Sequence, residues 1–231
     1  MRKIGLIGGL TWFSTRSYYE HINRAIQRRA DPRASAPMII DSLDAATLGG
    51  LSTAEGWDRA ASELSDSAKR LEEAGATALL IGANSMHKIY DRVAEAVSIP
   101  ILHIADCVAD RMVAQGAKKA ALIGTRNVMV ESFYRQKLIA RDIELLPPSM
   151  DRVEILDRII YEELFRGIAT RTSERELKTI ITNLEKAGAQ SIVLGCTELD
   201  MIVDVDANVL PIFDCTRIHC DAAVEWILGE G

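Results

Sequence analysis

Short apolar runs alternate with longer amphipathic segments along the chain. The apolar runs are rich in isoleucine, leucine, valine and alanine, and several end at glycine, as buried strands of parallel sheets often do. The longer segments carry apolar residues at helical spacing, and several are followed by a glycine suited to a left-handed helix cap. This alternation predicts an α/β fold in which helices cover both faces of parallel sheets.

The predicted strands are the apolar runs at 3–8, 38–42, 78–82, 101–104, 120–124, 144–145, 191–195 and 210–213. The predicted helices are the amphipathic segments at 14–29, 54–74, 87–96, 106–115, 129–141, 152–167, 173–188 and 218–228. Helices between successive strands supply the crossover connections that parallel pairing requires.

Three segments of the first half recur in the second half, in the same order. LEEAGATALLIGANS (71–85) recurs as LEKAGAQSIVLGCTE (184–198), KIGLIGG (3–9) as KAALIGT (119–125), and PILHIAD (100–106) as PIFDCTR (211–217). One such pair is weak evidence of duplication, but the offsets of 113, 116 and 111 residues agree closely. The repeat therefore predicts two homologous α/β units related by a pseudo-twofold axis.

The repeat also predicts the domain bounds. We expect a first domain at 1–100 together with about 213–231, and a second domain at 101–212. It does not decide which sheet receives the strand at 210–213 and the terminal helix. No low-complexity linker separates the two halves.

Composition and charge narrow the class of protein. The chain has 27 lysine and arginine residues against 33 aspartate and glutamate residues, a formal net charge of −6, and 48% hydrophobic residues. These values are typical of a globular protein and disfavour a nucleic-acid partner. No run approaches the 18 to 20 apolar residues of a membrane-spanning helix, so no membrane partner is expected. The 4 cysteines form no CxxC pair, which favours a reducing, cytoplasmic location.

Candidate chemistry lies where the predicted strands end, because ligands of parallel sheets bind at the carboxyl ends of the strands. The loops at these ends are 8–12, 83–85, 124–125 and 196–198, and they are rich in glycine, threonine, serine and asparagine. Such small hydrogen-bond donors predict a small ligand that carries a carboxylate. The sequence has no GxGxxG, P-loop or HExxH motif, so we expect neither a cofactor nor a metal ion.

Cys196 is the candidate acid/base or nucleophile. It stands at a strand end that leads into a predicted helix, where the helix dipole would favour a thiolate. The alternative is a buried cysteine that acts as a small hydrophobic residue. The repeat makes Ala83 the equivalent position in the first unit.

Seven motifs follow one another along essentially the whole chain: IGLIGGLTWFST, SYYEHIN, ANSMHK, GTRNVM, IIYEEL, LGCTEL and PIFDCTRIH. Together they resemble the motifs of the aspartate/glutamate racemase family. The resemblance implies a racemase independent of pyridoxal phosphate, with two pseudo-symmetric α/β domains and the active site in the cleft between them. It also implies an acidic amino acid as substrate and a homodimer. Two residues, typically both cysteines, would exchange the α-proton on opposite faces.

The resemblance assigns roles residue by residue. Cys196 is an acid/base, and the hydrogen-bond donors to the α-carboxylate and the developing enediolate are Thr11, Asn84, Ser85, Thr125 and Thr197, with Leu10 beside Thr11. Ser52 matches a position that recognises the substrate side chain. Arg166 either pairs with a second carboxylate or lies on a solvated face. Glu198 either orients Cys196 or binds the substrate ammonium group.

The sequence departs from the family at the second acid/base position. The family usually has cysteine there, and some members have threonine, but this chain has Ala83, which can neither accept nor donate a proton. Three explanations stay open. Ala83 is an introduced change; it is natural, and Ser85, His87 or a water serves that face; or the enzyme does not invert stereochemistry.

Three functions follow from these explanations. The first is a racemase-type enzyme for aspartate or glutamate, atypical or weakly active, in which Cys196 exchanges the α-proton from one face. The second is a decarboxylase or cis-trans isomerase of a dicarboxylate that uses one cysteine. The third is an inactive homologue that only binds an acidic amino acid.

Overall fold

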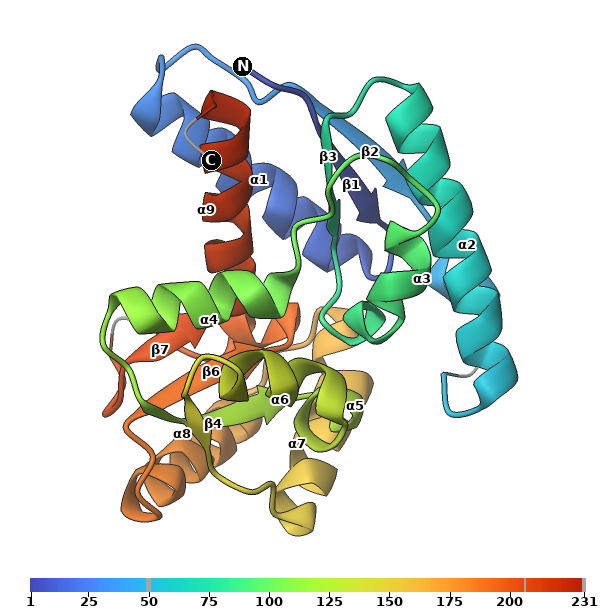
Figure 1. The fold of residues 1–231 in the computed structure, drawn as a ribbon. Helices are drawn as coiled ribbons and strands as arrows, with labels where there is room; N and C mark the ends of the chain where they lie inside the picture. The colour runs from blue at the N-terminus through green and yellow to red at the C-terminus, as the bar shows by residue number, and fades with distance from the viewer. Residues whose placement is uncertain (49–50, 206, 230–231) are drawn as a thin grey trace. The chain divides into compact units, whose positions relative to one another are not determined.

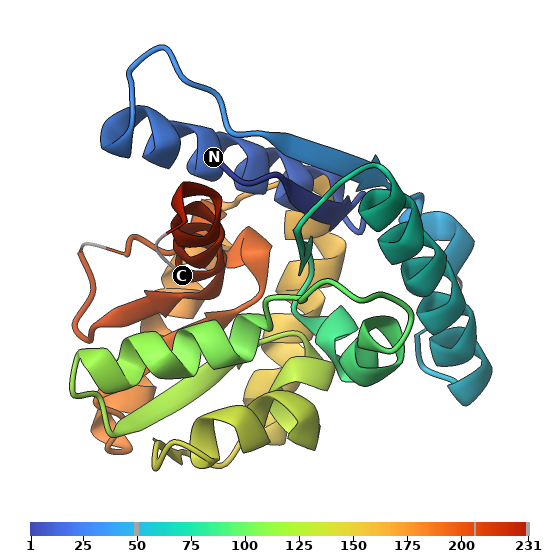
Figure 2. The same cartoon turned by 45° about the horizontal axis from the view of Figure 1, so that its top comes forward.

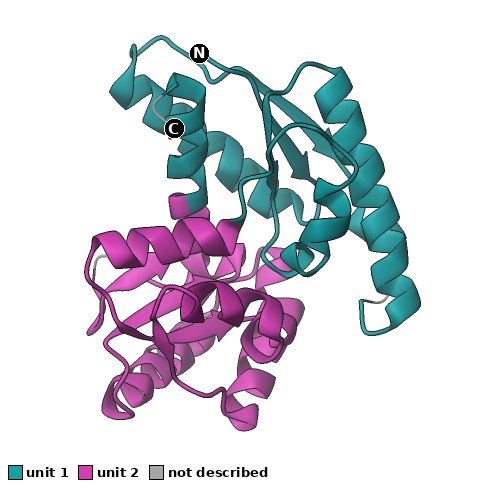
Figure 3. Cartoon of the chain, in the orientation of Figure 1, with its two compact units in different colours: residues 1–103, 219–231 teal, residues 104–218 magenta. Residues whose placement is uncertain are grey.

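The chain forms two compact units, and the computed structural model describes residues 1–48, 51–205 and 207–229. Unit 1 consists of Met1–His103 and His219–Gly231, and unit 2 consists of Ile104–Ile218 (Figure 3). The chain therefore crosses between the units twice, after His103 and after Ile218. The crossings predicted from the repeat lie a few residues earlier.

Unit 1 is built on a three-stranded parallel sheet in the order β2-β1-β3 (Figure 1). The strands are β1 (Ile4–Gly8), β2 (Met38–Ser42) and β3 (Ala78–Ile81). The helices are α1 (Trp12–Arg29), η1 (Ala45–Leu48), α2 (Ala54–Glu73), η2 (Ser85–Ile89), α3 (Tyr90–Ala94) and the part of α9 (Cys215–Leu228) that follows the second crossing. Thr11 and Thr53 cap the long helices α1 and α2, because each hydroxyl oxygen accepts a backbone N–H of the first turn.

Alternate residues of these strands face two different helical layers. Ile4 and Leu6 pack with β3 residues against α1 and α9, whereas Ile7 packs with Leu79 and Ile81 against α2 and α3. The ribbons of these helices can be followed in Figure 2. Strand side chains alternate between the faces of a sheet, so one strand contributes to both cores. Each fully buried aliphatic side chain adds about 1.5–3 kcal/mol to stability.

Unit 2 is built on a four-stranded parallel sheet in the order β5-β4-β6-β7. The strands are β4 (Lys119–Gly124), β5 (Glu144–Leu145), β6 (Ser191–Gly195) and β7 (Ile212–Asp214). The helices are α4 (Ile104–Ala114), α5 (Arg126–Val130), α6 (Ser132–Ile139), α7 (Met150–Glu162), η3 (Leu164–Arg166), α8 (Arg171–Lys186) and η4 (Thr197–Met201). One face of the sheet packs against α7 and α8, and the other against α4 and α6.

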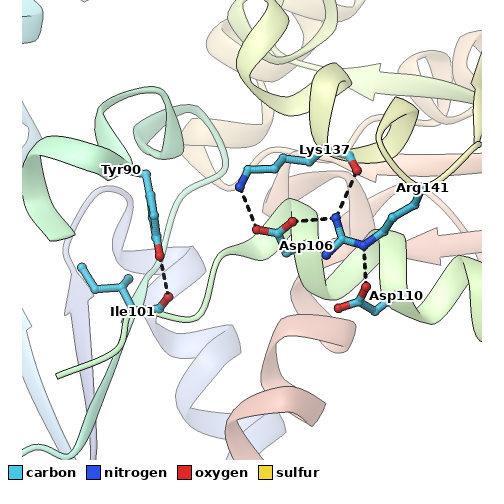
Figure 4. A network of polar contacts seen from close by, with 6 residues as sticks. All are labelled: Tyr90, Ile101, Asp106, Asp110, Lys137 and Arg141. Atoms are coloured by element: carbon cyan, nitrogen blue, oxygen red, sulfur yellow. Dashed lines mark hydrogen bonds and ion pairs between the residues drawn. The ribbon is translucent and has the colours of Figure 1, made fainter.

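A polar network joins α4 to the α6 segment in unit 2. Asp106 accepts hydrogen bonds from Lys137 at 2.9 Å and from Arg141 at 2.8 Å, and Arg141 also binds Asp110 (Figure 4). These side chains are partly exposed, so the network adds little to stability and mainly fixes how the two helices align.

The topology confirms two repeated α/β units. β1 pairs with β3 in unit 1 as β4 pairs with β6 in unit 2, and a long helix, α2 or α8, precedes β3 or β6. β7 joins the sheet of unit 2, whereas the terminal helix belongs to unit 1 from His219 onward. The repeat alone left both assignments open.

The strand expected at 101–104 is wrong. The chain makes one parallel bridge there, Leu79 to Ile101, and α4 already begins at Ile104. In the repeat, Leu79 and Ile101 correspond to Ile192 and Ile212, which pair β6 with β7 in unit 2. Unit 1 therefore has a single backbone pairing at the place where unit 2 has a fourth strand. Of the apolar residues after Ile101, Leu102 packs on the core shared with α1 and α9, and Ile104 already belongs to α4. A short apolar run does not distinguish these outcomes from a strand.

Two expected helices also differ. The helix predicted at 129–141 is two helices, α5 and α6, that meet at Glu131, whose backbone is extended. The segment predicted at 87–96 begins as the 3-10 helix η2 before α3. Within the described residues no helix combines the length and apolar character needed to cross a membrane.

Candidate active site

Two glycines bring the ends of β4 and β6 together in unit 2. Gly124 and Gly195 are partners in the sheet, and a Cβ atom on Gly124 would lie 2.6 Å from the carbonyl oxygen of Gly195. Only glycine fits this approach. The next residues, Thr125 and Cys196, therefore leave the sheet side by side at its carboxyl edge.

Glu198 binds the thiol of Cys196. The thiol donates a hydrogen bond to Glu198 Oε2 at 3.2 Å, and the hydroxyl of Thr197 donates to the same oxygen at 2.9 Å. All three side chains are buried, with exposed fractions of 4–6%. A buried carboxylate with a thiol proton in contact is an acceptor for that proton, so the pair can act as one acid/base unit.

The structure corrects the expected ionisation of Cys196. Burial raises the pKa of the Cys196 thiol well above its ordinary value of 9.0, and the negative charge of Glu198 raises it further. The element that follows is η4, a five-residue 3-10 helix, rather than a long α-helix with a strong dipole. The expectation of a thiolate favoured by a helix was therefore wrong, and Cys196 is a thiol held by an acceptor.

Thr125 contributes a second polar group at this edge. Its side chain is 5% exposed, and its hydroxyl has no hydrogen-bond partner among the residues that the structure describes. A buried hydroxyl without a partner costs free energy, so a ligand that accepts its hydrogen bond gains affinity. Thr125 is thus suited to bind an anionic oxygen beside Cys196.

Helix α7 adds residues that the sequence did not single out. Asp157 accepts the backbone N–H of Arg126 at 2.9 Å, which fastens α7 to the end of β4. One turn later, Tyr161 packs against Phe165 with 4.9 Å between ring centroids. Tyr161 is 46% exposed, and its partial burial raises its pKa to about 12, with Asp157, Cys196 and Glu198 contributing in the same direction. Tyr161 is therefore close to the thiol and stays a hydrogen-bond donor; its motif, IIYEEL, was the only sequence signal.

The corresponding edge of unit 1 carries Ala83, Asn84 and Ser85. They follow β3, whose end is tied to α1 because the Ser14 hydroxyl donates to the carbonyl oxygen of Gly82 at 2.6 Å. Asn84 is buried, whereas Ala83 and Ser85 are half-buried. The Ala83 methyl group packs against the hydrophobic core beneath α2, so this position offers no group that transfers a proton.

Gly9 shapes the loop after β1. Its φ of +74° suits glycine, and a Cβ atom there would lie 1.9 Å from the carbonyl oxygen of Leu43. The following Leu10 is buried in the core, so only its backbone is suited to contact a polar ligand. Thr11 caps α1 by accepting the N–H of Ser14 at 3.1 Å.

The two residues predicted to recognise a substrate side chain are exposed. Ser52 precedes α2, and Arg166 ends η3. Arg166 is in unit 2 with Cys196, and η3 contacts η4. Ser52 is in unit 1, with Ala83 and Asn84. Across the described residues, no group of three or more potential metal ligands gathers.

Known proteins resemble the chain over most of its length. A family model described as Asp/Glu/Hydantoin racemase matches residues 7–223. The structure of a proposed Asp/Glu racemase from Yersinia pestis is 39% identical, with 99% of this chain and 100% of that chain covered and a TM-score of 0.90.

Two further relatives extend this likeness. An aspartate racemase homologue from Pyrococcus horikoshii OT3 is 32% identical, with 99% of this chain and 100% of that chain covered and a TM-score of 0.86. The broad specificity amino-acid racemase RacX of Bacillus subtilis is 22% identical over 182 residues, which are 71% of this chain and 70% of that protein.

Proposed function

Because this chain belongs to the Asp/Glu/hydantoin racemase family, we propose that it transfers a proton at the α-carbon of an acidic amino acid, with Cys196 as the acid/base of one face. The observation that carries the proposal is the hydrogen bond from the Cys196 thiol to the buried carboxylate of Glu198, at 3.2 Å. Removing a weakly acidic α-proton needs both a base and stabilisation of the charge that develops.

Glu198 and Thr125 meet these two needs. In the proposed step the thiol proton moves to Glu198, and the thiolate takes the α-proton. The electron pair of the broken C–H bond moves onto the α-carboxylate, which becomes an enediolate. The Thr125 hydroxyl donates a hydrogen bond to this enediolate, where negative charge grows. The reverse steps return a proton to the α-carbon and restore the thiol and Glu198.

Ala83 limits this chemistry to one face. We propose that the Ala83 methyl group lies on the face of the α-carbon opposite Cys196, where inversion requires a second acid. A methyl group has no proton to give, so the carbanion is reprotonated mainly by Cys196, with retention. The chain then exchanges the α-proton of one enantiomer much faster than it interconverts the two enantiomers.

The substrate class rests on the family and on Arg166. The two related structures are those of a proposed Asp/Glu racemase and of an aspartate racemase homologue. In the proposal Asn84 and Ser85 bind the α-carboxylate, and the exposed guanidinium of Arg166 pairs with the side-chain carboxylate. Ser52 is proposed to contact the same side chain, and the active protein is proposed to be a homodimer.

The missing second acid also favours a different candidate. When decarboxylation creates the carbanion, one acid is enough to complete the reaction, so a decarboxylase that acts on a substituted malonate needs only Cys196. This candidate shares the Cys196 and Thr125 roles and differs in the bond that breaks. It predicts release of carbon dioxide from a malonate and no exchange of an amino-acid α-proton.

The test follows α-proton exchange in D₂O by proton NMR, with each enantiomer of aspartate and glutamate and with a substituted malonate in a parallel sample. We expect one enantiomer of one amino acid to lose its α-proton signal, while chiral analysis finds little of the other enantiomer. Cys196→Ser should reduce this exchange by about 10²–10⁴-fold. Cys220→Ser, a change at a buried cysteine of unit 1, is the matched control and should keep it.

Turnover of the malonate without exchange of any amino acid would replace the racemase-type function by the decarboxylase. Binding of aspartate without exchange would leave only a binding protein. Equal exchange in the wild type and in Cys196→Ser would exclude Cys196 as the acid/base.

A further inference from the structure

Unit 1 contains a buried cluster of histidine and tyrosine side chains that the proposed reaction does not use. Of the 4 histidines in the chain, His87, His103 and His219 belong to it. The ring centroid of His87 lies 4.5 Å from that of His103 and 5.8 Å from that of His219. Each of the three histidines is at most 6% exposed.

The hydrogen bonds of His219 fix its tautomer. Nε2 lies 2.8 Å from the carbonyl oxygen of Leu102, which can only accept, so Nε2 carries the hydrogen. Nδ1 lies 2.7 Å from the hydroxyl of Tyr18 and therefore accepts from it. Neutral His219 thus satisfies both partners, whereas a protonated ring would present a second N–H to Tyr18.

The cluster is continuous with the turn after β3. His87 belongs to η2, which begins at Ser85 directly after Asn84. The backbone N–H of His87 donates a hydrogen bond to the Asn84 carbonyl oxygen. Tyr90, at the start of α3, donates to the carbonyl oxygen of Ile101 at 3.1 Å (Figure 4). The turn is therefore held against the segment Ile101–His103, and His219 is hydrogen-bonded to the Leu102 carbonyl oxygen of the same segment.

We propose that His219 is a positioning residue for the turn that carries Asn84 and Ser85, that it acts through Leu102, His103 and His87, and that it does so only while its ring is neutral. The inference rests on the proposed function in one respect, namely that Asn84 and Ser85 bind the substrate α-carboxylate. The positioning itself is a property of unit 1 alone.

The surroundings of His219 favour the neutral ring. Titratable side chains face His219 from the elements packed on it: Tyr18 of α1, His87 of η2 and His103 of the segment before α4. Tyr90 of α3 packs against His87 and His103. Burial lowers the pKa of His219 from 6.5 to about 4, the Leu102 carbonyl opposes this shift, and His103 adds to it. The ring therefore stays neutral at neutral pH and gains a proton only in acid.

The test measures amide hydrogen exchange, resolved by residue, in two variants with matched controls. His219→Gln keeps a donor for Leu102 and removes the titrating ring; its control is His21→Gln, a change at the one histidine outside the cluster. Tyr18→Phe removes the hydroxyl that donates a hydrogen bond to His219 Nδ1. Its control is Tyr19→Phe, a change at an exposed neighbour on α1. We expect residues 85–90 to exchange about tenfold faster in both variants, with β1 unchanged.

The pH profile separates positioning from general stability. In the wild type, after correction for the intrinsic exchange rate, protection of 85–90 should fall as the pH drops from 6.5 toward 4, and in His219→Gln it should not depend on pH. At pH 7.5, equal changes in 85–90 and in β1 between the wild type and the variants would overturn the inference, and so would no change in 85–90.

Aspartate titrations distinguish this inference from the proposed function. We expect His219→Gln to bind aspartate about tenfold more weakly than the wild type at pH 7.5, as expected when a binding turn loses its support. If the wild type does not bind aspartate or glutamate while the exchange results hold, the proposed function fails and the positioning stands. If the wild type binds aspartate and the variants bind it equally well, the positioning fails alone.

Discussion

Replacing Ala83 by cysteine is expected to raise the rate at which aspartate or glutamate is inverted by about 10²–10⁴-fold, the usual contribution of one general acid. The wild-type methyl group gives the carbanion no proton, so nearly every turnover ends with the original configuration. A thiol at position 83 supplies the missing proton. Chiral chromatography of the amino acid after incubation measures the rate of inversion directly.

Two controls isolate the thiol in this experiment. Ala83→Val fills similar space without a transferable proton and should stay at the wild-type rate. Ala83→Cys combined with Cys196→Ser should also fail to invert, because one acid again remains. An equal rate of inversion in Ala83→Cys and Ala83→Val would contradict the two-face account.

Acid is expected to destabilise unit 1 through His219. The pKa of this side chain is 6.5 unfolded and about 4 folded, because burial disfavours the charged ring. The unfolded state therefore binds more protons between these values, and stability falls as the pH drops from 6.5 to 4. The shift corresponds to about 3 kcal/mol at most, a large part of the stability of a small domain. Above pH 6.5 this contribution does not change.

Tryptophan fluorescence measures this effect in unit 1 alone, because the 3 tryptophans, Trp12, Trp57 and Trp226, all belong to that unit. Urea unfolding of the wild type and of His219→Gln at several pH values gives their difference in unfolding free energy. That difference should shift by about 3 kcal/mol in favour of the variant between pH 7.5 and pH 4. A difference that does not depend on pH would contradict the lowered pKa.

The fold was predictable where the sequence repeats itself. The duplicated segments around β1 and β3, and around β4 and β6, predicted two parallel α/β units, and the topology confirms them. The segment after Pro100 was not predictable, because Ile101 makes a single bridge, Leu102 packs on the core with α1 and α9, and α4 begins at Ile104. Periodicity cannot distinguish these two fates in so short a run.

The candidate site was predictable in its positions and not in its electrostatics. The sequence placed Cys196 and Thr125 directly after strands that end in glycine, and the sheet register brings these two strand ends side by side. The raised pKa of Cys196 depends on burial and on the contact with Glu198, which strand-end position does not reveal. Tyr161 joins this group through the packing of α7, and the cluster around His219 assembles from four separate segments.

A crystal structure of the wild-type protein with aspartate bound would show directly whether Cys196 and Ala83 lie on opposite faces of the α-carbon. We expect the α-carbon to lie about 3–3.5 Å from Cys196 Sγ, the distance of a reactive contact. We also expect the α-carboxylate to accept a hydrogen bond from the Thr125 hydroxyl, and the Ala83 methyl group to lie on the opposite face. An α-carbon remote from Cys196, or a side chain other than Ala83 with a transferable proton on the opposite face, would rule out the proposed one-face reaction.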